Sequence, residues 1–120
     1  MNNLIKIQVK DDQQLVSARS LHKGLDLKSR FNEWTSQNFK EFENGSDYTY
    51  AVTTAHVGNG ATREITDYLL TIDMAKELCM MSKTSKGREV RKYFIQVEKN
   101  WNNPDMIVQR ALAIQNNKVQ

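Results

Sequence analysis

The sequence predicts an α+β fold in which about five helices pack on a small antiparallel sheet. Three observations indicate this class: an alternating stretch near the N-terminus, a long Thr- and Tyr-rich segment in the middle, and helical apolar spacing in the second half. A chain of 120 residues is enough for one compact domain. Its 39% hydrophobic and 26% charged residues are typical of a folded protein.

Two pairs of strands are predicted. In "LIKIQVK", residues 4–10, apolar residues alternate with polar ones, which indicates a strand with one buried face. A turn at residues 11–14 leads to a short second strand at Leu15 and Val16. Longer strands are expected near 48–56 and 61–70, joined at Asn59-Gly60, because this pair suits a tight turn that needs positive φ.

Two short helices are predicted between these strand pairs. Ser17 is a suitable N-cap for the first helix, and Gly24 is expected to end it in the left-handed conformation. A second helix is expected to start near Lys28 and to bury an aromatic stripe. The apolar residues of that helix are Phe31, Trp34, Phe39 and Phe42.

Three further helices are predicted downstream. Thr71 is a natural N-cap for the first, over residues 72–82, where Cys79 is expected to be a small core residue. Because Met74, Met80 and Met81 spread beyond its main apolar face, this helix is expected to be buried on more than one side. A long helix follows over residues 84–101, and a last one over 105–115, just after Pro104.

The long helix has two unlike faces. Its apolar residues fall within about a third of the helical circle: they are Val90, Tyr93, Phe94, Val97 and Trp101. Arg88, Lys92 and Lys99 lie almost opposite, with Lys83, Lys86 and Arg91 nearby. This cationic face is either an ordinary solvated surface or a docking surface, and the partner would then be DNA phosphate or an acidic protein.

A second pattern favours DNA. The stretch "SARSLHKGLDLKSRFNEW" places two short helices around a Gly-containing turn, as in a helix-turn-helix. The downstream hairpin would sit where the wing of a winged helix sits, so a winged-helix-like N-terminal half is one alternative. The candidate DNA-binding residues are Ser29, Arg30, Asn32, Ser36 and Lys40 on the helix and Arg63 near the hairpin tip.

No pattern for chemistry is present. His22, His56 and Cys79 do not form a metal-ligand set, and Gly58-Asn59-Gly60 is too short to cradle a phosphate. We therefore expect neither an enzyme nor a bound metal or cofactor. A single cysteine excludes an internal disulfide, and the sequence has no membrane-spanning run and no signal peptide, so an intracellular protein is expected.

The segments "LTIDMAKELCM" and "KGREVRKYFIQVEKNW", with "LVSARSLHKGLDLKSRFNEW" before them, resemble the AntA/AntB family of bacteriophage antirepressors. The resemblance implies a regulator of phage or prophage lysogeny in the bacterial cytoplasm. It would relieve repression of lytic genes either by binding the phage repressor or by occupying operator DNA. Residues 1–103 would form the antirepressor domain. Residues 104–120 would form a helix that leads to a further domain or joins copies of the chain.

Binding of the repressor by stoichiometric association is the interpretation we favour. Exposed apolar residues framed by cations would then supply the affinity. The candidate partner-binding residues are Met80, Lys83, Lys86, Arg88, Arg91, Lys92, Ile95 and Lys99.

Overall fold

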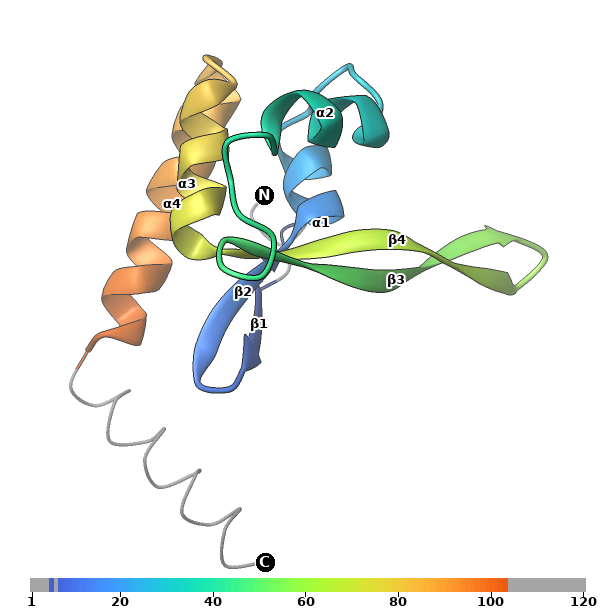
Figure 1. The fold of residues 1–120 in the computed structure, drawn as a ribbon, viewed down its shortest axis with the longest axis horizontal. Helices are drawn as coiled ribbons and strands as arrows, with labels where there is room; N and C mark the ends of the chain where they lie inside the picture. The colour runs from blue at the N-terminus through green and yellow to red at the C-terminus, as the bar shows by residue number, and fades with distance from the viewer. Residues whose placement is uncertain (1–4, 6, 104–120) are drawn as a thin grey trace, which may run out of the picture.

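The computed structural model describes residue 5 and residues 7–103, which form a four-stranded antiparallel sheet and four helices (Figure 1). In chain order the elements are β1 (Ile7–Lys10), β2 (Gln13–Ser17), α1 (Ala18–Gly24), α2 (Phe31–Asn38), β3 (Tyr48–Gly58), β4 (Ala61–Thr71), α3 (Ile72–Met81) and α4 (Ser85–Trp101). The strand order in the sheet is β1-β2-β4-β3. The predicted α+β class is confirmed, and the fifth predicted helix, 105–115, lies outside the described residues.

Both hairpins turn through residues with positive φ, as two-residue turns require. Asp11 and Asp12 have φ of 53° and 60°, and Asn59 and Gly60 have φ of 53° and 76°. The prediction at Asn59-Gly60 is therefore confirmed. The single buried face predicted for residues 4–10 is only partly present, because Val9 is 61% exposed.

Hydroxyl side chains begin three of the helices. Ser17 Oγ accepts from the Ser20 N–H at 3.3 Å, and Thr71 Oγ1 accepts from the Met74 N–H at 3.2 Å, as the sequence predicts. Thr84 Oγ1 does the same for the Gly87 N–H at 3.0 Å.

The prediction that Gly24 ends α1 in the left-handed conformation is wrong. Gly24 is a buried residue of the helix, and the left-handed residue is Asp26, with φ of 54°. A Cβ atom on Gly24 would lie 2.7 Å from Cγ1 of Ile5. The glycine therefore lets the chain before β1 approach the helix closely.

The predicted extent of the second helix is also wrong. Helix α2 begins at Phe31 and ends at Asn38, where the Asn38 side-chain amide donates to the Trp34 carbonyl at 2.9 Å. Phe39 therefore lies beyond the helix, with ring centroids 5.0 Å from Tyr48 and 5.5 Å from Tyr68. This aromatic cluster fastens α2 to the root of the β3–β4 hairpin.

The core lies between the root of the sheet, α1 and the side-by-side helices α3 and α4 (Figure 1). Val90 and Phe94 of the predicted α4 face are fully buried, whereas Tyr93, Val97 and Trp101 are partly buried. Helix α3 buries Met74 as well as its main face, whereas Met80 and Met81 are 60% and 39% exposed, so burial beyond the main face is confirmed for Met74 alone of the three methionines, and Met80 is exposed as the partner-binding prediction requires.

A winged-helix arrangement is not confirmed. The outer part of the β3–β4 hairpin extends away from α2 and from every other helix of the described part (Figure 1). No helix among residues 5 and 7–103 is both long and apolar enough to cross a membrane.

Candidate functional site on helices α3 and α4

The turn between α3 and α4 is tightly built. Lys83 takes a left-handed conformation with φ of 54°, and Ser82 Oγ donates to the Cys79 carbonyl at 2.6 Å. A Cβ atom on Gly87 would lie 2.4 Å from that same carbonyl oxygen. The first turn of α4 therefore passes so close to α3 that only glycine fits. Sequence reasoning missed Gly87, although a glycine inside a strong helical pattern often marks such packing.

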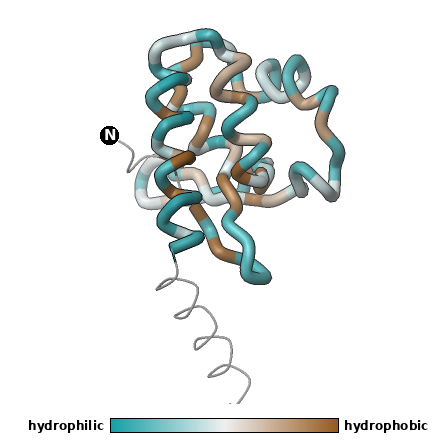
Figure 2. Tube along the Cα trace, turned by 90° about the vertical axis from the view of Figure 1, so that its left-hand side faces the viewer, coloured by the Kyte–Doolittle hydropathy of each residue, from teal (hydrophilic) through white to brown (hydrophobic). Residues whose placement is uncertain are grey.

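This close crossing leaves a surface depression of about 530 Å³. It is lined by Cys79, Met80, Lys83, Thr84, Gly87, Arg88 and Arg91. Four of the eight predicted partner-binding residues, Met80, Lys83, Arg88 and Arg91, are brought together here. Figure 2 views the molecule from the left-hand side of Figure 1 and shows α4 as a largely hydrophilic helix.

Two of the lining residues, Cys79 and Met80, are apolar and neutral. Met80 is 60% exposed, whereas Cys79 is 1% exposed. Burial raises the pKa of the Cys79 thiol to about 12, and the nearby charge of Arg91 opposes that rise only in part. The thiol therefore stays protonated at neutral pH, as a structural core cysteine does.

Three cationic residues line the depression, Lys83, Arg88 and Arg91, and we call them its rim. They make no ion pair with a neighbouring carboxylate in the described part of the chain. Among residues 5 and 7–103, the ion pairs join Lys76 to Asp73 and Glu98, and Lys86 to Glu89; none includes Lys83, Arg88 or Arg91. Arg91 Nε is buried without a hydrogen-bond partner in this part of the chain. Lys83 and Arg88 are exposed, so their charges remain available to an anionic partner.

The other predicted partner-binding residues do not line the depression. Lys86 is partly buried and lies 3.7 Å from Glu89, whereas Lys92 and Lys99 are exposed farther along α4. Ile95 is partly buried, so its side chain is less exposed than that of Met80.

The predicted DNA-binding residues do not form one surface. Arg30, Asn32, Ser36 and Lys40 are exposed on or beside α2. Ser29 is partly buried, and its carbonyl oxygen lies 2.8 Å from His22 Nε2. Arg63 pairs with Ala55 far out on the hairpin, which runs away from α2 (Figure 1).

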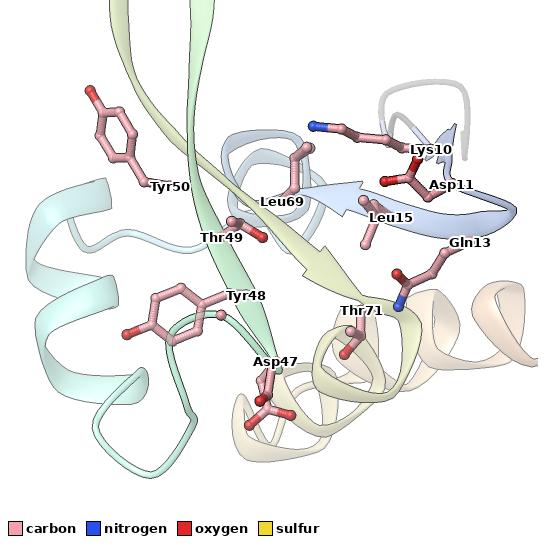
Figure 3. Close-up of a pocket in the computed structure, with 12 residues that line it drawn as sticks. Lys10, Asp11, Gln13, Leu15, Asp47, Tyr48, Thr49, Tyr50, Leu69 and Thr71 are labelled. Atoms are coloured by element: carbon pink, nitrogen blue, oxygen red, sulfur yellow. The ribbon is translucent and has the colours of Figure 1, made fainter.

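A second hollow of about 260 Å³ lies between the β1–β2 hairpin and the root of β3 (Figure 3). Asp47 in its wall accepts from the Glu43 N–H at 2.9 Å, and Thr71 is the N-cap of α3. Its polar side chains are spread along the wall and do not converge on one point (Figure 3). Asp47 and Thr71 therefore have structural roles in this wall.

The family model for the AntA/AntB antirepressor matches residues 16–84, more than half of the chain. The chain belongs to the AntA/AntB antirepressor family. No curated protein and no solved structure matches it. The matched part of the chain runs from Val16 to Thr84, so it includes Met80 and Lys83. The α4 segment that shares the resemblance, residues 86–101, lies beyond the match.

Proposed function

We propose that this antirepressor relieves phage repression by binding the repressor protein at the depression between α3 and α4. One observation carries the proposal: Met80 is 60% exposed inside a rim of Lys83, Arg88 and Arg91. Methionine adapts its shape to a partner, and an apolar anchor within a charged rim is typical of protein interfaces. The family supports a regulatory role.

The partner surface that fits this site is acidic around an apolar side chain. The apolar side chain would pack on Met80, and carboxylates would face Arg88 and Lys83. The cationic rim would speed the encounter, and burial of the methionine would slow dissociation. Occupancy of the repressor then prevents it from holding its operator, without any chemical step.

The test begins with capture of the tagged antirepressor from induced lysogenic cells and identification of the repressor that co-purifies. A titration of the purified pair follows, with Arg88→Glu compared with Lys99→Glu. Both variants make the same charge change on α4, but only Arg88 lines the depression. We expect Arg88→Glu to weaken binding at least about tenfold and Lys99→Glu to change it about twofold or less. Equal effects would contradict a localised site.

A DNA-binding function is the second candidate. Asn32 and Ser36 lie one turn apart on the exposed side of α2, with Arg30 and Lys40 at its ends. Such a surface would position phosphates, and its binding would fall steeply with salt. A gel shift on phage control-region DNA at several salt concentrations, with Arg30→Ala, separates the two functions. DNA binding that disappears in Arg30→Ala would favour the α2 surface.

A further inference from the structure

The outer edge of strand β3 is open over most of its length. Strand β3 is the last strand of the sheet, and it pairs with β4 from Tyr48 to Gly58. Its root is covered: the Gly45 N–H donates to the Tyr48 carbonyl at 2.6 Å, and the Tyr48 N–H donates to the Glu43 carbonyl at 3.4 Å. Tyr48 therefore directs its backbone groups away from β4.

Antiparallel pairing alternates, so every second residue after Tyr48 also directs its N–H and C=O outward. These residues are Tyr50, Val52, Thr54 and His56. Within residues 5 and 7–103, no backbone group bonds to their outward-facing groups. The loop at 43–45 covers only the first position of this edge.

The opposite edge of the hairpin, on β4, is protected against pairing with another strand. Arg19 Nε donates to the Thr66 carbonyl of β4, and the Tyr68 N–H donates to Asp67 Oδ1 at 2.7 Å. Farther out, β4 carries the charged residues Arg63 and Glu64. Strand β3 has no Lys, Arg, Asp, Glu or Pro in eleven residues, so it lacks the usual protection of an edge strand.

We propose that β3 pairs antiparallel with β3 of a second copy of this chain. A register centred on Thr53 sets Tyr50 opposite His56 and Val52 opposite Thr54, and it uses every open position of both edges. Each facing pair of this kind exchanges two backbone hydrogen bonds, about eight in all. The two sheets become one sheet across a two-fold axis, the commonest symmetry of protein dimers.

Charge selects a second copy over nucleic acid as the occupant. Strand β3 offers no Lys or Arg to a phosphate backbone, and the one arginine near the tip, Arg63, lies beside Glu64 on β4. Two uncharged β3 edges meet without like charges facing each other. Tyr50 and Val52, which are 61% and 47% exposed, lose solvent contact in the pair.

Sedimentation velocity of the full chain over a concentration series tests the proposal. We expect the wild type to form a dimer as concentration rises. The backbone N–H of Val52 points outward and makes no hydrogen bond to β4. Val52→Pro removes this N–H, so it should weaken dimerisation at least about tenfold. Thr62→Pro is the matched control, since Thr62 faces His56 and directs its N–H outward on the other edge. It should dimerise like the wild type.

If circular dichroism shows that Val52→Pro does not fold, two further measurements still test the proposal. Val52→Lys places two cations near the two-fold axis and should also abolish the dimer. In the wild type, hydrogen exchange at Tyr50, Val52 and Thr54 should slow with concentration, while exchange at Thr62 and Glu64 stays unchanged. A wild type that is monomeric throughout, or a dimer that persists in Val52→Lys, would overturn the proposal.

Discussion

Helices α3 and α4 differ sharply from the outer half of the β3–β4 hairpin in the interactions that stabilise them. Helix α3 alone buries Ile72, Met74, Ala75, Leu78 and Cys79. Between Val52 and Glu64 no side chain of the hairpin is fully buried, and only Thr53 and Ala55 are partly buried. One region is supported by a core, and the other by backbone hydrogen bonds and the anchor at its root. A two-stranded ribbon is marginally stable by itself, so we expect the outer half of the hairpin to gain stability from the surface that it binds.

The largest effect expected from this comparison is at the centre of the helical region. Phe94 is 0% exposed, so Phe94→Ala should lower the free energy of unfolding by about 3–5 kcal/mol. Urea denaturation followed by circular dichroism measures this loss. A cost under about 1 kcal/mol would show that the α3–α4 pair does not depend on its core.

A glycine comparison tests how tightly α3 and α4 cross. In Gly87→Ala the new Cβ meets the Cys79 carbonyl at 2.4 Å, and a backbone atom cannot move away without shifting a helix. We expect a cost of about 2–3 kcal/mol. Gly24→Ala is the control: its Cβ meets only side-chain atoms of Ile5, Cγ1 at 2.7 Å and Cδ1 at 2.8 Å, which can move more easily than a backbone carbonyl, and the cost should be about 1 kcal/mol. Equal unfolding midpoints for the two variants would contradict the close crossing.

Two strand valines compare the core and the hairpin directly. Val16 is 0% exposed and Val57 is 54% exposed, and both lie in strands. Val16→Ala should cost about 2 kcal/mol, and Val57→Ala within about 0.5 kcal/mol. Thermal unfolding of the two variants measures the difference. Similar losses would mean that the hairpin has a supporting contact of its own.

The smallest expected effect concerns the ion pair between α3 and α4. Lys76 Nζ lies 2.6 Å from Glu98 Oε1, and this hydrogen bond raises the pKa of Lys76 above its ordinary value of 10.5. A raised lysine pKa means that the stabilisation is fully present below pH 10.5 and is lost as pH rises through the folded-state value. Lys76→Met should cost about 0.5 kcal/mol at neutral pH.

The pH dependence provides the control for that ion pair. The stability difference between wild type and Lys76→Met should shrink above pH 10.5, where the lysine loses its charge in the unfolded and then in the folded state. A difference that stays constant across that range would assign the cost to the lost aliphatic packing of Lys76.

Local backbone rules in the sequence predicted much of the fold. Ser17 and Thr71 cap helices because their hydroxyls accept orphan N–H groups, and Asn59-Gly60 turns the hairpin because both residues accept positive φ. Each of these features depends on a few neighbouring residues, so reading the sequence is enough to find them. The Thr- and Tyr-rich composition that predicted the long strands is local in the same way.

Contacts between distant segments decided the rest. Gly24 lies inside α1, where the absence of a Cβ leaves room for Ile5, and Phe39 lies beyond α2 against Tyr48 and Tyr68. The sequence predicted an exposed Met80 or Ile95 framed by Arg88, Arg91 and Lys92, but it could not show that Met80, Arg88 and Arg91 line one depression while Ile95 and Lys92 lie outside it. That grouping follows from the close crossing at Gly87, and a crossing of two helices is a property of the packed structure and of neither helix alone.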